Sequence, residues 1–470
     1  MLSVPRDRAW RRLFLAQSIA LVGTGLATVA LGLLAHDLAG DRAGTVLGTA
    51  LAIKMVAYVG LAPLIAALTH RMAPRALLVA ADLVRAVVAL ALPLVTEVWQ
   101  VYALIFVLQS ASAAFAPAFQ SLLPRLLPAE EDYTRALSLS RLSYDLEMVL
   151  SPALAAVLLT RIDHPTLFLG TVAGFLVSAV LVLRTRVPQA GPRPEARAAG
   201  FGDRATRGIR LFLATPRLRA LLALTLAVAA GGSTVLVNTV VHVRDDLGRA
   251  ARDVPLALGA YGAGSMTAAL LLPRLSRRVA DRTLMLPAAF ASALLLTALA
   301  AATRLGPGSW SWPVLLATWA ALGLAESAVV TPTGRLIRRS ARTADLTGAF
   351  AAHFSLSHGC WLLTYPLAGW LGATAGLDGA ALVLGAVALA AALAARRLWP
   401  AGDPARLAHV HTALGDGHPH LAGARRTGAG WRHTHHFVID DLHDRWPLRP
   451  AGRGRPVRVP RRSGRPTMGA

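Results

Sequence analysis

The sequence has few charged residues, one lysine and one cysteine. Charged residues make up 16% of the 470-residue chain, against about 25% in soluble domains. The single cysteine, Cys360, excludes a disulfide within the chain, and Lys54 is the single lysine. The sequence also contains no Walker A motif, nucleophile elbow or paired-cysteine metal cluster. It therefore gives no sign of an ATP-driven pump or an enzyme, and we expect no cofactor.

Long apolar runs are the main feature of the first 400 positions. Hydrophobic residues make up 55% of the chain, and the mean hydropathy is +0.51. The runs are mostly long enough to cross a hydrocarbon core of about 30 Å. This pattern predicts an all-α membrane protein rather than a large soluble helical protein. Twelve transmembrane helices are predicted near residues 13–35, 46–68, 76–96, 99–123, 142–160, 165–183, 218–241, 255–275, 284–303, 311–334, 348–372 and 378–395.

The distribution of arginine predicts the orientation of the chain. A formal charge of +23 is typical of nucleic-acid-binding proteins, but these arginines lie in short connections and in the tail, so we expect a lipid bilayer and no nucleic acid. The connections on one side contain 26 Lys and Arg residues, and those on the other side contain 6. Both termini are therefore expected in the cytoplasm. Arg6 and Arg8 precede an apolar run too long for a signal core, so no cleavable signal is expected.

A Pro-, Gly- and Arg-rich segment divides the twelve spans into six and six. The predicted units are an N-terminal bundle at 1–186, a cytoplasmic linker at 187–215, a C-terminal bundle at 216–398 and a largely disordered His/Arg-rich cytoplasmic tail at 399–470. The short basic segments 70–77 and 277–284 match at four positions. Two repeats related by an axis along the membrane normal are an arrangement found in transporters.

The fifth span carries two carboxylates, Asp145 and Glu147, inside an apolar helix. A charge in hydrocarbon costs roughly 2.5–3.5 kcal/mol on insertion scales, so such groups usually face water, a partner or a cargo. The two residues lie about 200° apart on an ideal helix, and Asp145 shares its face with Pro152. We therefore expect Asp145 to face a central cavity, where it can exchange a proton for a cation. Alternatively, these carboxylates pair with Arg141 or Arg135 at the cytoplasmic rim.

The eleventh span adds groups that can bind borderline metals. His353 and Cys360 lie on one stripe at i and i+7, and His358 faces roughly the other way. Imidazole and thiolate suit nickel, cobalt and zinc, although a buried histidine often only hydrogen-bonds a neighbour and a buried cysteine often packs as an apolar residue. Glu326 and Lys54 are the other predicted intramembrane charges, and they serve either as proton sites or as partners in structural ion pairs.

The tail contains eight of the 14 histidines. Together with two aspartates, they form a candidate chelating or buffering segment near the cytoplasmic mouth, and the alternative is a solvated tail with no such role. The candidate ligands are His409, His411, His418, His420, His433, His435, His436, His443, Asp440 and Asp441.

Two segments resemble motifs of the major facilitator superfamily over roughly residues 10–398. The segment around Arg71 and Arg75 resembles its conserved G-x-L-a-D-R-x-G-R-R loop, with His70 in place of the aspartate. Asp82 and Arg85, one turn apart in the third span, are predicted to form an internal pair instead. The fifth span resembles the exporters' G-x-x-x-G-P-x-x-G-G motif, with Ser151-Pro152 in place of Gly-Pro. These likenesses imply a facilitator fold and favour efflux.

Four further segments resemble the branch that holds nickel and cobalt resistance exporters: 132–147, 331–340, 357–366 and 437–443. The resemblance implies a monomeric proton antiporter in a bacterial inner membrane, working by alternating access and expelling a divalent transition-metal ion. It also supports His358 as a site residue. The runner-up is a proton-coupled multidrug or siderophore exporter, and a membrane-embedded metal sensor without flux is a further alternative.

Overall fold

The computed structural model describes most of the chain as helix. The described residues are 7–39, 43–69, 72–185, 201–250, 253–306, 308–403, 406–412, 414–415, 418–440, 442–443 and 446–447. Arg71, Asp441 and residues 448–470 lie outside these ranges.

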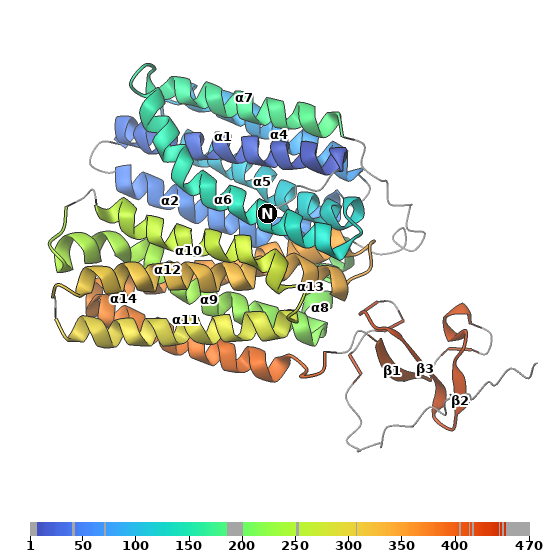
Figure 1. The fold of residues 1–470 in the computed structure, drawn as a ribbon. Helices are drawn as coiled ribbons and strands as arrows, with labels where there is room; N and C mark the ends of the chain where they lie inside the picture. Colours follow the sequence, from blue (N-terminus) through green and yellow to red (C-terminus); the bar gives the residue numbers. More distant parts are fainter. Residues whose placement is uncertain are drawn as a thin grey trace, which may run out of the picture.

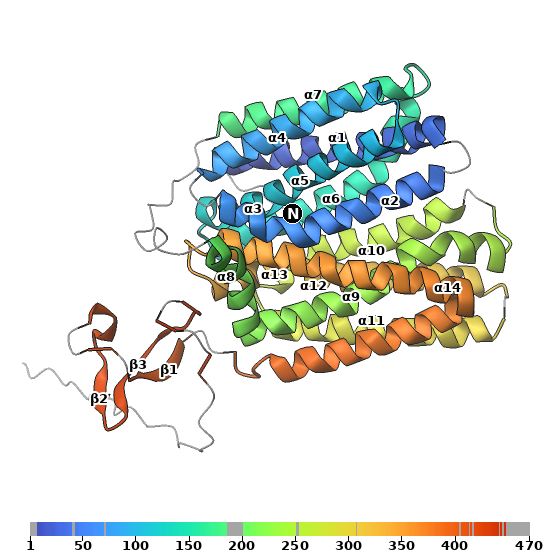
Figure 2. The same ribbon diagram turned by 180° about the vertical axis from the view of Figure 1, so that it is seen from behind.

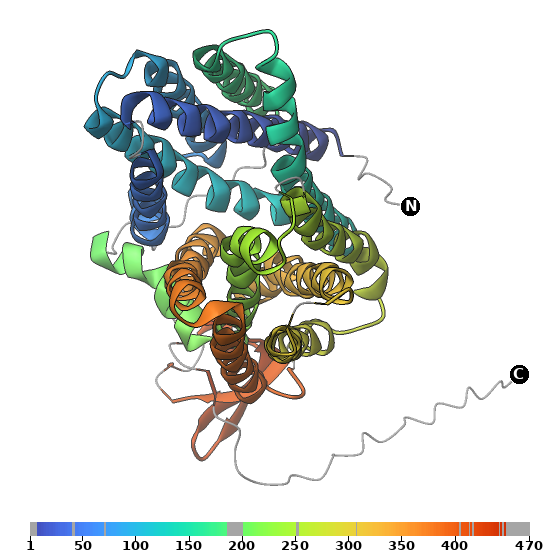
Figure 3. The same cartoon turned by 90° about the vertical axis from the view of Figure 1, so that its left-hand side faces the viewer.

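The helices form two groups that lie side by side (Figures 1 and 3). The first group contains α1 (Arg8–Ala39), α2 (Ala43–Val56), the π-helix η2 (Ala57–Leu61), α3 (Ala62–Leu68), α4 (Pro74–Ala91), η3 (Leu92–Leu94), α5 (Val98–Leu126), α6 (Glu130–Leu158) and α7 (His164–Leu183). The second contains α9 (Pro216–Val241), the π-helix η5 (His242–Asp246), α10 (Val254–Leu275), α11 (Asp281–Arg304), α12 (Ser311–Val330), α13 (Thr333–Ser340) and α14 (Leu346–Leu398). Helix α8 (Phe201–Ala214) lies between them in the chain and packs against α3 and α14.

The starts of several helices follow from local sequence. Proline occupies the first turn of α4, α7, α9 and α10, where its missing N–H needs no partner. Glu97 and Gln100 form a reciprocal capping box at the start of α5. These local signals determine where each helix begins, and the length of the apolar segment determines where it ends.

Each of the twelve predicted spans coincides with helix. Two of them are joined in α14, where Gly376 has φ +70° and ψ −179° and separates the predicted spans 348–372 and 378–395. Among the described residues, nine helices are long and apolar enough to cross a membrane. Helix α6 is not one of them, and its apolar half carries three charged residues. Twelve crossings therefore stay a prediction.

Helices α10 and α12 approach so closely that their contact requires glycine. A Cβ added to Gly264 would overlap the carbonyl oxygen of Ala320, and one added to Gly323 would overlap the carbonyl oxygen of Tyr261. Backbone atoms cannot move aside as a side-chain end can, so the two glycines set the distance between these helices.

We expect Gly264→Ala and Gly323→Ala each to destabilise the folded protein by about 1 to 3 kcal/mol, the usual cost of overpacking. The measurement is thermal unfolding of the detergent-solubilised protein. Gly262→Ala is the matched control on α10, because a Cβ at Gly262 meets nothing within 4 Å. Equal melting temperatures for the Gly262 and Gly264 variants would contradict the assignment.

The described part of the tail contains a small sheet, within a segment that the sequence predicts to be largely disordered. Residues β1 (Arg406–His411), β2 (Arg425–Thr427) and β3 (Gly430–His436) form an antiparallel sheet in the order β1-β3-β2, with the short 3-10 helix η7 (Pro419–Leu421) between β1 and β2. The sheet lies at one end of the bundle, beside α8 and α13 (Figures 1 and 2).

Along β1 and β3, buried or partly buried histidines alternate with exposed residues, and this period of two is a strand pattern that composition alone does not reveal. Phe437 and Ile439, which follow β3, are buried in the same apolar core as Trp399 and the second helix group. We call this end of the molecule, with α8, α13 and the sheet, the arginine-rich end.

Candidate functional site

A buried network of charged and polar side chains joins the two helix groups where α6 packs against α10. Arg141 Nε lies 3.1 Å from Asp145 Oδ1, one turn along α6. Ser265 of α10 donates a hydrogen bond of 2.8 Å to Asp145 Oδ2, and Arg141 also donates to Ser265 Oγ, at 3.0 and 3.1 Å. Asp145, predicted to face a central cavity, therefore lies at the interface between the groups.

Glu326 of α12 belongs to the same network. Arg141 Nη2 lies 3.1 Å from Glu326 Oε1, and Tyr261 of α10 donates its hydroxyl to Glu326 Oε2. Asp145 and Glu326 are only 8% and 7% exposed. One guanidinium thus bridges two buried carboxylates, one from each helix group.

Glu147 lies elsewhere, as its position on the helix predicts. Its carboxylate is close to Gly25 of α1 and Ser151 of its own helix, and it interacts electrostatically with Lys54 of α2. Arg135 pairs instead with Glu131 and Asp132 on the first turns of α6. The alternative of an ion pair with Arg141 is therefore present for Asp145, whereas Glu147 lies near Lys54 instead.

The predicted ligands of α14 do not join Asp145. Among the contacts of the described residues, His353 stacks on Phe212 of α8 at 6.0 Å, and His358 meets the ring of Tyr58 edge-on at 4.7 Å. Cys360 is buried and free. Across the boundary between the groups, α6 packs against α10, whereas α14 packs against α5, α3 and η2. A chamber shared by Asp145, His353, His358 and Cys360 stays a prediction.

A second polar cluster forms around Tyr58, in the π-helix η2. Its hydroxyl donates to Gln109 Oε1 at 2.9 Å, and Lys54 Nζ lies 5.6 Å from its ring centroid. His358 bonds through Nδ1 to the carbonyl of Phe354 at 2.7 Å. Lys54 and His358 are thus brought together, through Tyr58, at the other contact between the helix groups.

The predicted pair of Asp82 and Arg85 is present and buried. Ser178 donates to Asp82 Oδ2 at 2.7 Å, and the guanidinium lies between the rings of Phe115 and Phe175, at 4.4 and 4.5 Å. This arrangement fixes α4 against α5 and α7 within the first group. It is a structural pair rather than part of the interface.

Three other predicted residues belong to the two segments that resemble facilitator motifs. Arg75 donates to the carbonyl of Leu183, and Pro152 lies within α6. Arg71 falls outside the described residues.

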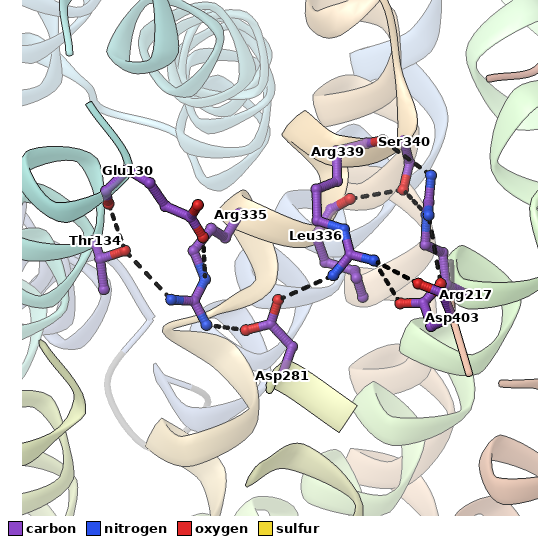
Figure 4. A network of polar contacts seen from close by, with 9 residues as sticks. All are labelled: Glu130, Thr134, Arg217, Asp281, Arg335, Leu336, Arg339, Ser340 and Asp403. Carbon is purple, nitrogen blue, oxygen red and sulfur yellow. Dashed lines mark hydrogen bonds and ion pairs between the residues drawn. The ribbon is translucent and has the colours of Figure 1, made fainter. Parts of the chain in front are cut away.

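At the arginine-rich end, a network of ion pairs connects the two groups (Figure 4). Arg335 of α13 forms a buried ion pair with Asp281, the first residue of α11. The same arginine reaches α6 of the first group, 3.4 Å from Thr134 Oγ1 and 4.0 Å from Glu130 Oε1. Arg277 pairs with Glu131 across the same boundary. Ion pairs therefore hold the two helix groups together at this end of the interface.

The network continues to the segment that leads into the tail. Arg339 Nη2 lies 2.7 Å from Asp403 Oδ2, and Arg217 reaches Ser340 Oγ at 2.7 Å and Asp403 Oδ1 at 3.4 Å. Arg217 is 1% exposed, so its charge depends on these partners. Figure 4 shows Asp281 and Asp403 on either side of Arg339.

Sequence reasoning missed Asp281, Arg217 and Asp403. It did single out 331–340 as a family-like segment and 277–284 as a repeated loop, and the structure places their arginine and aspartate in contact. The sequence signal that could have revealed this ion pair is an aspartate at the start of a helix, directly after a basic loop, together with an arginine-rich helix later in the chain.

The tail histidines converge on the sheet. Nitrogen atoms of His409, His411, His420, His433 and His435 lie within 4.8 Å of one another, and His443 Nε2 lies 3.1 Å from His409 Nε2. Burial, aided by neighbouring imidazoles, lowers the pKa of His409 and of His411 to about 4, so both rings are neutral at pH 7. We call these six residues the histidine cluster.

Of the four other predicted tail ligands, the structure describes three, which lie apart from the histidine cluster or beside it. His436 is exposed and faces the opposite side of β3, and His418 Nδ1 accepts from the backbone of His420. Asp440 contacts His443 Nδ1 at 2.8 Å and pairs with Arg342. Asp441 falls outside the described residues.

Two curated proteins resemble parts of the chain. Macrolide efflux protein A of Enterococcus faecalis is 26% identical over 186 residues, which cover 37% of this chain and 57% of that protein. The protein of the same name from Streptococcus pyogenes is 24% identical over 211 residues, or 44% of this chain and 51% of that protein. The chain thus spans a little over half the length of these relatives.

Solved structures share the fold at low sequence identity. A bacterial homologue of the iron transporter ferroportin, in its outward-facing state, gives a TM-score of 0.68 at 16% identity over 83% of this chain and 99% of that one. The human organic anion transporter MFSD10 gives 0.66 at 15% over 83% and 100%. The sequence also matches the Major Facilitator Superfamily over residues 13–237 and 222–438. The chain therefore belongs to the Major Facilitator Superfamily, and its long apolar helices are those of a multi-pass membrane protein.

Proposed function

We propose that this transporter is an exporter that exchanges protons for a divalent transition-metal cation, with its arginine-rich end facing the cytoplasm. The two six-helix groups would rock about the interface at which Arg141 bridges Asp145 and Glu326. Nickel and cobalt are the favoured cargoes, because segments 132–147, 331–340, 357–366 and 437–443 resemble exporters of these ions.

The observation that carries the proposal is the imbalance of charge at this interface. Two buried carboxylates, Asp145 and Glu326, share the single guanidinium of Arg141. An uncompensated charge in a low-dielectric interior is costly, so one further positive charge is needed there, and a proton or a cargo cation supplies it. A site that accepts either one, but not both together, is what antiport requires.

The geometry also supplies a route for coupling. The carboxylates come from α6 and α12, and Ser265 and Tyr261 come from α10. Separation of the groups breaks the bridge of Arg141 and exposes the carboxylates to water, whereas closure requires the missing positive charge. Proton or cation occupancy would thus decide when the two groups can close, which makes transport depend on the exchange.

A second candidate is export of a macrolide-like drug. Both curated relatives are named as macrolide efflux proteins, and aromatic rings lie at the other contact between the groups. Tyr58 of η2 and Phe354 of α14 are 4.8 Å apart. Trp361 and Tyr365, also on α14, are 5.0 Å apart, and Trp361 lies near Gly232 of α9 within the second group. Such rings suit an apolar cargo.

Transport by everted membrane vesicles tests the proposal. With an outward-directed proton gradient established inside the vesicles, we expect addition of Ni²⁺ or Co²⁺ to dissipate the gradient and to load the vesicles with metal. Asp145→Asn should reduce both signals to those of vesicles without the protein, because the exchangeable charge is lost. Asp378→Asn should not, since Asp378 pairs with exposed Arg304 in a connection outside the interface.

Three outcomes separate the alternatives. Proton release by a macrolide but not by the metals would support the second candidate and exclude metal export. Metal accumulation that is unchanged in Asp145→Asn would exclude Asp145 as the exchange site. Binding without flux for every cargo would favour the membrane-embedded sensor.

A further inference from the structure

We propose that the histidine cluster of the tail sheet is a folded binding site for one borderline divalent transition-metal ion, ligated by imidazole nitrogens. The site lies outside the membrane bundle and does not depend on what the bundle carries. It differs from a flexible histidine-rich chelator because its ligands are held by strand pairing.

Strand register places four of the ligands on one face. His409 of β1 is directly opposite His433 of β3, and Leu407 is opposite His435. Because side chains alternate between the two faces of a strand, His409 and His411 share a face, as do His433 and His435. One face of the sheet therefore presents four imidazoles, two from β1 and two from β3, and strand pairing alone brings them together.

The spacing of the ring nitrogens matches that of ligands around one ion. His409 Nε2 lies 3.0 Å from His411 Nε2, 3.2 Å from His433 Nε2 and 3.2 Å from His435 Nε2. Metal–nitrogen bonds of about 2.0–2.1 Å place neighbouring ligands about 2.8–3.0 Å apart in octahedral geometry and about 3.3–3.4 Å apart in tetrahedral geometry, and the observed distances lie between these ranges. Ring packing alone does not require that several Nε2 atoms point at the same place.

The outer nitrogens are tied to oxygen acceptors. His443 Nδ1 lies 2.8 Å from Asp440 Oδ1, His435 Nδ1 lies 2.7 Å from the carbonyl of His436, and His409 Nδ1 lies 3.2 Å from the carbonyl of Leu407. When Nδ1 donates to such an oxygen, the proton is fixed there and Nε2 keeps its lone pair. Histidines that bind metals typically have this second set of partners.

His420 provides an independent sign of a missing partner. Its Nε2 atom is buried and has no hydrogen-bond partner among the described residues, although its ring packs 4.8 to 4.9 Å from those of His411, His433, His435 and His443. A buried polar atom without a partner is costly. A cation bound among these nitrogens would satisfy it.

The donor set decides the class of ion. Neutral imidazoles favour Zn²⁺, Ni²⁺, Co²⁺ and Cu²⁺, whereas Mg²⁺ and Ca²⁺ require oxygen ligands. Asp440 is turned toward His443 and Arg342 and is a positioning residue rather than a ligand.

Titration of the purified, chelator-treated full-length protein with Co²⁺ and Zn²⁺ tests the site. We expect one equivalent of Co²⁺ to bind with the visible absorption of nitrogen-ligated cobalt, and Zn²⁺ to displace it. Removal of outer-nitrogen partners alone typically weakens metal binding 10–100-fold, so the double variant His433→Ala/His435→Ala should lose at least about 100-fold in affinity.

His436→Ala is the matched control, because this neighbouring histidine faces away from the cluster. It should leave affinity and spectrum unchanged, and an equal loss in both variants would overturn the proposal. The variant Asp145→Asn/Glu326→Gln should retain the cobalt spectrum, which separates this site from the membrane interface. An unchanged thermal unfolding of the bundle in the His433/His435 variant shows that lost binding is not lost folding, and failure of the folded wild-type protein to bind Co²⁺ would also overturn the proposal.

Discussion

Replacing Arg141 with glutamine should destabilise the folded protein by about 3 to 5 kcal/mol. The change leaves Asp145 and Glu326 buried at one interface without the guanidinium that now bridges them, and breaking a buried ion pair from one side has a cost of this size. Transport should be lost together with stability. Thermal unfolding in detergent and vesicle transport are the two measurements.

A compensated variant distinguishes structure from function. Arg141→Gln combined with Asp145→Asn and Glu326→Gln removes all three charges, so most of the lost stability should return while transport stays absent. Arg304→Gln is the control, because Arg304 pairs with Asp378 at the surface, where an ion pair contributes about 0 to 1 kcal/mol. Transport by the uncharged triple variant would show that the network only holds the groups together.

Asp281→Asn should open the arginine-rich end and abolish productive transport. Arg335 is 5% exposed, and Asp281 is its buried carboxylate partner, so the loss should cost roughly 3 to 5 kcal/mol in the closed state. The open state, in which these arginines meet water, loses much less. The balance between the states therefore shifts, and the transporter stalls with this end open.

A variant with the two side-chain charges swapped and a control at a surface ion pair make this test more specific. The single variant Arg335→Asp should be inactive, and the double variant Asp281→Arg/Arg335→Asp should recover part of the vesicle transport rate. Arg277→Gln removes the pair with Glu131, in which both side chains are about half exposed, and should change the rate little. A fully active Asp281→Asn protein would contradict a gating role.

The sequence was sufficient to predict the helices because membrane spans depend on local properties. Twenty apolar residues must satisfy their own backbone hydrogen bonds, so the positions of the helices and the break between the last two predicted spans followed from composition. The same reasoning located Asp82 and Arg85, which are one turn apart on one helix, and separated Glu147 from Asp145. The relative positions of residues on a single helix can be predicted without knowledge of the tertiary structure.

Partners on different helices could not be predicted in this way. Asp145 meets Ser265 of α10, and its guanidinium partner reaches Glu326 of α12; neither contact follows from the residue pattern along α6. Helical periodicity states which residues share a face, and it does not state which other helix that face contacts. All six members of the histidine cluster were predicted as candidate ligands, but their convergence was not, because His409 and His411 meet His433 and His435 only when β1 and β3 pair.

The π-helix η2 has a mechanical consequence for the second span. One wide turn at Ala57–Leu61 holds an extra residue, which leaves a backbone carbonyl poorly placed for its own helix, and the hydroxyl of Ser355 from α14 donates to the carbonyl of Val59. The backbone hydrogen-bond ladder of the second span is thus interrupted at this turn, and a side chain of the other helix group supplies a hydrogen bond there. A bend at this turn would exchange a single hydroxyl contact and leave the rest of the ladder intact, so the bond from Ser355 sets the stiffness of the turn.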